Sequence, residues 1–410
     1  MISASILRGA NRSENIVMEA LIRNEIRELK DEIIQIRREF HKYPELGFKE
    51  KRTSAKIADY LRNLGLEVQV GIASTGVVAL LPGSARGRTL LVRADMDALP
   101  IQEKNEVPYK SREDGVMHAC GHDGHMAIAL ITAKILSRHQ ELFSGQVKFV
   151  FQPGEEGFAG AREMINAGVL AEPKVDAAIG LHLAHFFPTG TIAVKSGPVM
   201  ASMDSFIIKI IGQAGHAAMP NEGVDAILIS AYLINALQSL ISKEVSPLSP
   251  LVVHVGKIHG GNAFNIIADH VELEGTVRTL DEGLQTSIPK HMDRIIKGVV
   301  DGLRGTYELD YNFGYPPLIN DSSMADLIRQ IAKQITDNDK VIDAQPMMVS
   351  DDMAFFLREV PGCYYFVGCS DHSGGIVQPA HSPHFDFDED AMITGAEVMV
   401  KAALEYLKSV

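Results

Sequence analysis

Four side chains that could bind a metal lie within eight residues of this chain, in the segment His-Ala-Cys-Gly-His-Asp-Gly-His (118–125). Thiolate and imidazole groups are ligands that zinc and its first-row relatives prefer. The chain has no Cys-x-x-Cys pair, and its other cysteines, Cys363 and Cys369, are far away in the sequence. A single cysteine flanked by histidines favours a catalytic metal site, completed by distant residues, over a structural zinc site.

Two adjacent carboxylates, Glu155 and Glu156, follow a short run of β-branched and aromatic residues at 147–151. This run predicts a buried strand. Open α/β sheets place their ligands at the carboxyl ends of such strands. Neighbouring residues in a turning segment point in different directions, so one carboxylate can bind a metal while the other faces a water molecule.

Other potential ligands also follow predicted strands or lie in tight loops. Asp95 and Asp97 come after a strand-like run at 89–94, and His182 ends another run at 175–181. His381 lies in a short segment before the acidic start of the last predicted helix. Together with the two glutamates and the 118–125 segment, these residues supply enough Cys, His and carboxylate groups for two metal ions.

The order of these segments resembles the metal-dependent amidohydrolases. This is the aminoacylase and carboxypeptidase family, with hippurate hydrolases, plant auxin-conjugate hydrolases and thermostable carboxypeptidases among its members. The resemblance extends from about Phe40 to the C-terminus. The matching segments are Arg-Ala-Asp-Met-Asp-Ala-Leu-Pro (93–100), the 118–125 segment, Gln-Pro-Gly-Glu-Glu-Gly (152–157), Gly-Leu-His (180–182), Gly-Gln-Ala-Gly-His-Ala-Ala-Met-Pro (212–220) and His-Ser-Pro-His-Phe (381–385).

The resemblance implies a role for each matching residue. Two divalent ions are expected, zinc first and Co, Mn or Ni as alternatives, with Cys120 as the bridging ligand. Glu155 is the expected general base, and Asp97 supports the metal site from behind the ligands. The resemblance assigns no role to His118 or His125, which we expect to be structural or to support the ligands. The implied metal ligands are Cys120, His122, Glu156, His182 and His381, and the implied substrate-binding residues are His216, Asn265 and Arg278.

The expected reaction is hydrolysis of the amide bond of N-acyl amino acids, or of the C-terminal residue of short or N-blocked peptides. Arg278 and Asn265 would recognise a free carboxylate on the leaving side, and His216, from a partner subunit, would donate a hydrogen bond to the oxyanion. Two alternatives stay open. Cys120 could be the nucleophile of a cysteine hydrolase, or the chain could be a non-catalytic metal- or peptide-binding protein.

Composition agrees with this interpretation. The 410 residues are 46% hydrophobic and carry a net charge of −13 without Trp, which makes nucleic-acid binding improbable. No apolar stretch is expected to reach the length of a membrane span, and residues 1–12 lack the pattern of a signal peptide. Three cysteines cannot all pair within one chain, and a thiolate ligand suits a reducing compartment. The sequence therefore predicts a cytoplasmic enzyme.

Periodicity divides the chain into two α/β parts. Residues 15–41 read as one amphipathic helix, and from there to about Pro198 helical patterns alternate with short strands. The following segment reads strand, helix, strand, strand, helix, strand, which is the ferredoxin-like order. Together with this order, the family resemblance implies a metallopeptidase-type sheet flanked by helices at 1–198 and 313–410, with a lid and dimerisation domain inserted at 199–312. Unpaired edge strands in this insert, and the resemblance, predict a homodimer or a tetramer.

Overall fold

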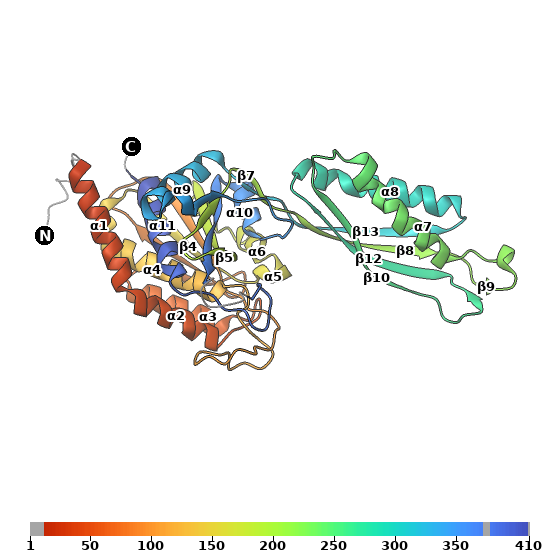
Figure 1. Cartoon of the computed structure of the whole chain (residues 1–410), viewed down its shortest axis with the longest axis horizontal. Coiled ribbons are helices and arrows are strands. Elements are labelled where there is room, and N and C mark those ends of the chain that lie inside the picture. The colour runs from red at the N-terminus through yellow and green to blue at the C-terminus, as the bar shows by residue number, and fades with distance from the viewer. Residues whose placement is uncertain (1–11, 372–377, 409–410) are drawn as a thin grey trace. The chain divides into compact units, whose positions relative to one another are not determined.

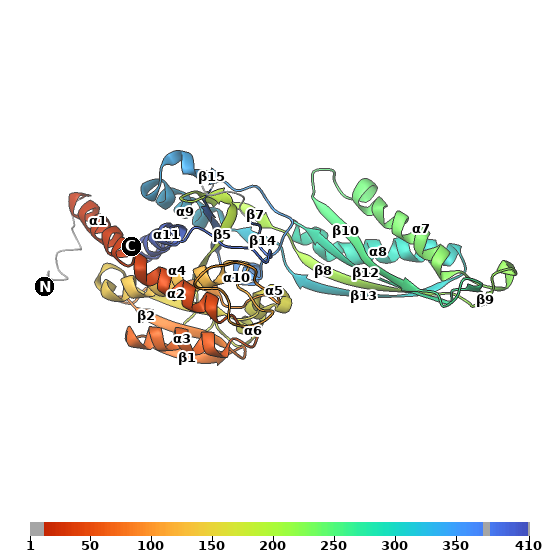
Figure 2. The ribbon, with the colours of Figure 1, turned by 60° about the horizontal axis from the view of Figure 1, so that its bottom comes forward.

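The computed structural model describes residues 12–371 and 378–408, so most of the expectation for residues 1–12 lies outside the described part (Figures 1 and 2). The described residues form two compact units, and the second is inserted into the chain of the first. The second unit consists of Pro198–Ile319 and Pro346–Ala354. The first consists of the described residues up to Gly197, Asn320–Gln345 and the described residues from Phe355 onward.

An eight-stranded mixed sheet forms the centre of the first unit. All seven residues of β3 are buried, as expected for a parallel strand that is covered on both faces. β3 pairs in parallel with β4 and with β5, and β5 pairs in parallel with β16. In their order across the sheet the strands are β1 (Glu67–Ile72), β2 (Gly76–Pro82), β4 (Gln146–Gln152), β3 (Thr89–Asp95), β5 (Ala177–Pro188), β16 (Gly362–Ser370), β6 (Ile192–Val194) and β15 (Val341–Asp343).

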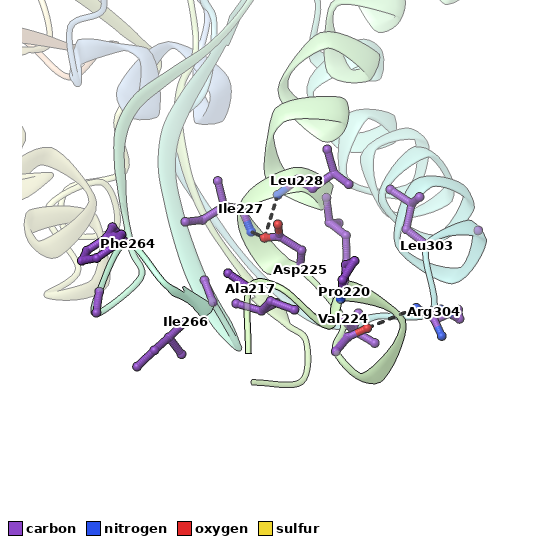
Figure 3. A pocket seen from close by; sticks show the side chains of 16 residues that line it. Ala217, Pro220, Val224, Asp225, Ile227, Leu228, Phe264, Ile266, Leu303 and Arg304 are labelled. Carbon is purple, nitrogen blue, oxygen red and sulfur yellow. Dashed lines mark hydrogen bonds between the residues drawn. The ribbon is translucent and has the colours of Figure 1, made fainter. Parts of the chain in front are cut away.

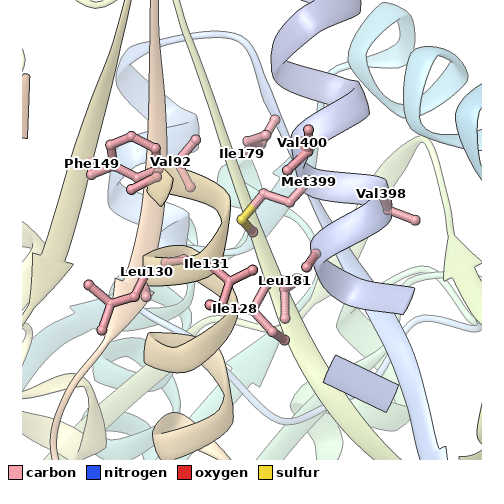
Figure 4. Close-up of a cluster of buried hydrophobic side chains, with 14 of the residues drawn as sticks. Val92, Ile128, Leu130, Ile131, Phe149, Ile179, Leu181, Val398, Met399 and Val400 are labelled. Carbon is pink, nitrogen blue, oxygen red and sulfur yellow. The ribbon is translucent and has the colours of Figure 1, made fainter. Parts of the chain in front are cut away.

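The helices of this part pack on the sheet and on one another. α4 is buried over most of its length because it contacts β3, β5, α2 and α11. Figure 4 shows Ile128 and Ile131 of α4 beside Val92 of β3, Leu181 of β5 and Met399 of α11. The helices are α1 (Arg12–Glu28), α2 (Lys30–Lys42), α3 (Lys51–Asn63), α4 (His122–Arg138), α5 (Glu155–Phe158), α6 (Gly160–Asn166), α9 (Ser322–Ile335), α10 (Met353–Glu359) and α11 (Ala391–Tyr406).

The prediction of a single helix over residues 15–41 was wrong. Two helices, α1 and α2, meet at Leu29, whose φ of −89° and ψ of 10° are not helical. The Leu29 N–H donates to the Ile26 carbonyl at 3.1 Å, three residues back instead of four. The break is local, and the apolar face continues across it through Ile26 and Ile33, which are both buried. No Gly or Pro marks this position in the sequence.

The second unit contains a four-stranded antiparallel sheet with two helices. Its elements follow in the order strand, helix, strand, strand, helix, strand, as the sequence pattern predicts. They are β8 (Met203–Ile211), α7 (Ala226–Ser239), β10 (Leu251–Gly260), β12 (His270–Thr279), α8 (Glu282–Gly302) and β13 (Thr306–Tyr315). The strand order is β10-β12-β8-β13, so β10 and β13 are the edges.

Short elements complete the second unit. β9 (Gly215–His216) pairs with β11 (Ile266–Ile267), and β7 (Gly197–Met200) pairs with β14 (Leu318–Asn320). The predicted domain boundary at residue 312 lies inside β13, and the second unit continues to Ile319.

The expectation that no apolar stretch reaches the length of a membrane span was wrong for one helical segment of the second unit. Ala226–Glu244 is 19 residues long and is apolar enough, by length and composition, to cross a membrane. In the structure Ile229, Leu233, Leu237 and Leu240 are buried in the core of the second unit. A core helix of a soluble domain passes the same test, so this segment is weak evidence for a membrane span.

Candidate metal centre

The predicted metal ligands come from four segments of the first unit. Cys120 and His122 lie at the start of α4, Glu156 follows the end of β4, and His182 lies within β5. His381 lies in a loop before α11 and is joined to the first segment by a hydrogen bond from its N–H to the Ala119 carbonyl at 2.7 Å. Because β3, β4 and β5 are parallel neighbours, their carboxyl ends lie on one edge of the sheet, where α/β proteins place ligands.

Two groups of three ligand atoms share Cys120. In one group the atoms belong to Cys120, His122 and His182, and in the other to Cys120, Glu156 and His381. Within each group all atoms lie within 4.8 Å of one another. Tetrahedral ligands that lie ~2.0–2.3 Å from one zinc ion are ~3.3–3.8 Å apart. Each group is thus only slightly wider than a single ion site, and the Cys120 sulfur belongs to both groups.

Backbone carbonyls orient two of the imidazole rings. Nδ1 of His122 lies 2.9 Å from the Asp97 carbonyl oxygen, and Nδ1 of His182 lies 2.8 Å from the Leu183 carbonyl oxygen. A carbonyl only accepts, so Nδ1 must carry the hydrogen in each ring. Nε2 is then unprotonated in the neutral ring, and Nε2 of His182 lies 3.5 Å from Sγ of Cys120. In both rings Nε2 is therefore the nitrogen left available to bind a metal.

Asp97 holds the two glutamates without belonging to either ligand group. Its Oδ1 accepts the Glu155 N–H at 2.9 Å, and its Oδ2 accepts the Glu156 N–H at 3.0 Å. The preceding N–H, of Gly154, donates to the buried Glu50 carboxylate at 2.9 Å. Three consecutive backbone N–H groups are thus bound by carboxylates, which fixes the turn that carries Glu155. Glu155 lies close enough to His122 and Glu156 to form a third group of possible ligands.

The charges of the site fit divalent ions. Burial lowers the pKa of His182 well below its usual value, so this ring is neutral, the form that binds metals. Cys120 and Glu156 raise the pKa of His381 to about 10, so this ring is protonated between two acidic groups. Oε1 of Glu156 is buried and lies 3.3 Å from Nε2 of His381 and 4.0 Å from Nε2 of His122. A divalent ion would supply the positive charge that the His381 proton now provides.

Asp95 is not in either group that shares Cys120, and its partners were not predicted. Its Oδ2 lies 2.6 Å from Nη1 of Arg93, and its Oδ1 lies 2.7 Å from Nδ1 of His125. Burial opposes ionisation of Asp95, but Arg93 and the histidines lower its pKa well below the usual range. A sequence signal existed for His125: it follows His122 by three positions in a helix, which places the two residues on one face.

The predicted substrate-binding residues all belong to the second unit. His216 and Asn265 are exposed neighbours, because β9 pairs with β11 and the Ala217 N–H donates to the Asn265 carbonyl at 3.1 Å. An apolar pocket of about 590 Å³ lies beside them, with Ala217 and Phe264 in its wall (Figure 3). Arg278 lies elsewhere, near the C-terminal end of β12, with weak contacts of 3.4 Å to Met348 and Ser350.

The length of β12 separates Arg278 from the other two residues. The β9–β11 pair lies beyond the end of the sheet where His270 of β12 faces Ile211 of β8. The eight residue-to-residue steps of extended strand from His270 to Arg278 span about 27 Å. Within one chain, Arg278 and His216 therefore lie near opposite ends of the second unit's sheet.

Comparison with known proteins identifies the family. The sequence model of a protein family described as Peptidase family M20/M25/M40 matches residues 91–405 of this chain. Thermostable carboxypeptidase 1 of Saccharolobus solfataricus is 38% identical over 389 residues, which are 94% of this chain and 98% of that protein. An N-acyl-L-amino acid amidohydrolase of Geobacillus stearothermophilus is 44% identical over 300 residues, which are 73% of this chain and 80% of that protein.

A solved structure agrees with these relatives. The crystal structure of the YXEP protein of Bacillus subtilis, described as a dinuclear metal-binding peptidase from the M20 family, has a TM-score of 0.83 at 33% sequence identity. The match covers 94% of this chain and 99% of that chain. The chain therefore belongs to peptidase family M20/M25/M40 and is a metal-dependent amidohydrolase.

Proposed function

We propose that this enzyme hydrolyses the amide bond of N-acyl amino acids, or releases the C-terminal residue of short or N-blocked peptides. The observation that carries the proposal is the pair of ligand groups that share Cys120, next to Glu155. The relatives' names support the substrate class, since one is a carboxypeptidase and another an N-acyl-L-amino acid amidohydrolase. Both activities cut an amide bond and release an amino acid with a free carboxylate.

Glu155 is the proposed general base and acid. Cys120, His122, Glu156, His182 and His381 would hold two divalent ions, for which we propose zinc. Bound ions supply Lewis acidity, which makes water a better nucleophile and polarises the amide carbonyl. Glu155 would take a proton from the attacking water and return it to the leaving amine. Asp97 holds the backbone of Glu155, so it keeps this carboxylate beside the ligands.

His216 has the hydrogen-bonding state that an oxyanion donor requires. Its Nδ1 accepts the Ala218 N–H at 3.0 Å, so in the neutral ring Nε2 carries the hydrogen and can donate. His216 is also exposed, and it is therefore accessible to a substrate. We propose that it donates to the oxyanion of the transition state, while Arg278 and Asn265 recognise the substrate carboxylate.

The second unit is proposed to be a ferredoxin-like lid and dimerisation domain. β10 is an edge strand with an exposed Ile258, and the adjacent α7 exposes Leu228 and Tyr232. An unpaired edge beside apolar side chains favours pairing with a second copy of the chain. The distance between Arg278 and His216 supports the same arrangement, since one substrate could contact both only if they came from different subunits.

Two further expectations remain proposals. We propose that the enzyme works in the reducing cytoplasm, because Cys120, Cys363 and Cys369 are all free thiols. We also propose that it binds neither nucleic acid nor membranes. The net charge of −13 opposes nucleic-acid binding.

The test is an assay of N-acyl amino acids and N-blocked dipeptides with metal-free and metal-reconstituted enzyme. We expect a chelator to abolish hydrolysis and a divalent metal to restore it. We also expect substrates whose free carboxylate is replaced by an amide to be cleaved more slowly. A chelator-resistant enzyme that a thiol alkylator inactivates would instead be a cysteine hydrolase. Burial raises the pKa of the Cys120 thiol, whereas nucleophilic cysteines usually have a lowered pKa.

A protein that binds metal and substrates but turns none of them over would be the non-catalytic alternative. The position of Glu155 beside His122 and Glu156 argues against that outcome, because a binding protein has no use for a base at this place.

A further inference from the structure

A chain of buried hydrogen bonds leads from β3 to the proposed ligand His182. Nη1 of Arg93 lies 2.6 Å from Oδ2 of Asp95, and Oδ1 of Asp95 lies 2.7 Å from Nδ1 of His125. Nε2 of His125 then lies 2.9 Å from the Leu183 nitrogen. The carbonyl of the same residue, Leu183, binds Nδ1 of His182 at 2.8 Å. The Asp95, His125 and Leu183 side chains are all buried.

The donors and acceptors along this chain are determined without knowledge of hydrogen positions. The Leu183 N–H can only donate, so Nε2 of His125 must accept and Nδ1 must carry the hydrogen. Nδ1 of His125 therefore donates to Asp95, whose second oxygen is occupied by Arg93. At the other end, the Leu183 carbonyl can only accept, so His182 carries its hydrogen on Nδ1.

Leu183 thus connects two histidines through one residue. His125 binds its N–H and His182 binds its C=O, so the position of the Leu183 backbone determines where the His182 ring lies. The two rings also touch, with centroids 4.7 Å apart and planes at 70°. A displaced His125 would release the Leu183 N–H and remove an edge-to-face contact of the His182 ring.

We propose that His125, oriented by Asp95, is a positioning residue that fixes the His182 ring with Nε2 directed at the metal. This inference rests on the proposed function, because it requires His182 to be a ligand. It gives a role to Asp95, whose oxygens bind Arg93 and His125. It also gives a specific role to His125, which the sequence analysis describes only as structural or as a support for the ligands. Partners that orient a metal-binding histidine typically change metal affinity ~10–100-fold when they are removed.

Two amide substitutions separate the two hydrogen bonds of His125. A glutamine side chain reaches as far as Nε2 of histidine, so His125→Gln can still accept from the Leu183 N–H. An asparagine reaches only as far as Nδ1, so His125→Asn keeps the bond to Asp95 and loses the bond to Leu183. His125→Phe keeps a ring of similar size and loses both bonds. His139→Gln, at the C-terminal end of the same helix, is the matched control.

The measurements are the dissociation constants of the two ions, by dialysis against metal buffers, and the visible absorption spectrum of the cobalt-substituted protein. Melting temperatures of the metal-free variants show whether each one folds. We expect His125→Asn and His125→Phe to weaken the binding of one of the two ions ~10–100-fold and to change the absorption spectrum of the cobalt-substituted protein. We expect His125→Gln to bind both ions within ~3-fold of the wild type, as should the control. A purely structural role predicts similar effects of Gln and Asn.

Equal affinity for both ions in the wild type and in folded His125→Phe would overturn the proposal, and so would equal losses in the Gln and Asn variants. His182→Ala separates this failure from failure of the proposed function. If His182→Ala binds both ions as the wild type does, His182 is not a ligand and the proposed metal site is wrong. If His182→Ala loses one ion while the His125 variants keep both, only the positioning role is wrong.

Discussion

Cys120 contributes the one atom that both groups of proposed ligands share, so its replacement affects two ions at once. A carboxylate can also bridge two ions, whereas a methyl group cannot bind either. We expect Cys120→Asp to keep part of the metal-dependent activity and Cys120→Ala to lose bound metal. Metal content by mass spectrometry and hydrolysis rates check both variants. Two ions bound normally in Cys120→Ala would show that the sulfur is not the bridge.

Glu155 differs from its neighbour Glu156 in the role that we propose for it. Glu155→Gln keeps the size of the side chain and removes the base, so the hydrolysis rate should fall by at least ~10²-fold. Metal content should remain that of the wild type, because the proposed ligands are unchanged. Glu163→Gln, in the nearby helix α6, is the control and should keep full activity. A Glu155→Gln variant with most of its activity would exclude this residue as the base.

At the level of single residues, the sequence points to the proposed ligands more directly than to the residues that hold them in place. The residues of the ligand groups are Cys, His and Glu in short segments after strands, and the family resemblance assigns each of them. The bond between Asp95 and His125 joins residues 30 positions apart through the packing of α4 on β3. The contact of Glu50 with Gly154 spans 104 positions. No local pattern encodes such contacts, since they depend on how the elements pack.

Among the elements, α2 is held to α4 by a buried cation. The Arg37 side chain is fully buried, and its guanidinium binds Asp123 of α4 at 2.7 Å, Asp386 at 2.8 Å and Glu389 at 3.2 Å. Its neighbour Arg38 also binds Glu389, but 40% of the Arg38 side chain is exposed. Arg37 therefore neutralises Asp123, a carboxylate that water cannot reach, whereas the partner of Arg38, Glu389, is partly exposed.

The neighbouring residues Arg37 and Arg38 give a prediction in which the second residue is the control for the first. Arg37→Ala removes the guanidinium from the fully buried Asp123 carboxylate and leaves His41, whose Nδ1 lies 2.8 Å away, as its remaining side-chain partner. Breaking a buried ion pair by removal of its cation typically costs about 3–5 kcal/mol. Arg38→Ala removes a solvent-exposed ion pair, which typically costs no more than about 1 kcal/mol. We expect a large drop in the melting temperature of the first variant and a small one in the second, measured by calorimetry on the metal-free protein. Equal drops would contradict the assigned role of Arg37.

Element order could be predicted where side-chain period and turn residues agree. In β12, Val271, Leu273 and Val277 are buried, and the alternation with polar residues predicts this pattern. The break between α1 and α2 could not be predicted, because an unbroken helical period runs through Leu29. Composition alone also cannot show that one face of the apolar segment Ala226–Glu244 packs in the core of the second unit.

For the whole molecule, the proposed arrangement is one in which two copies of the chain together make each active site. Arg278 and His216 lie near opposite ends of a sheet whose strand β12 is about 27 Å long between His270 and Arg278. A single N-acyl amino acid is much shorter than this. If both residues bind the substrate, they must come from different copies, and a symmetric dimer would then contain two equivalent shared sites.

Mixing two inactive variants tests this arrangement. Glu155→Gln lacks the base but retains His216, and His216→Ala lacks the proposed oxyanion donor but retains Glu155. In a mixed dimer with shared sites, one site combines an intact Glu155 with an intact His216, while the other site carries both defects. We expect the mixture to recover up to about a quarter of the wild-type activity, because statistical exchange makes half of the dimers mixed and each mixed dimer has one working site. Exchange is verified by native mass spectrometry of differently labelled subunits. His259→Ala, a change in another exposed histidine of the second unit, is the control for His216→Ala and should keep wild-type activity by itself. A mixture of Glu155→Gln and His216→Ala that stays inactive after complete exchange would show that His216 acts within its own chain or takes no part in the reaction.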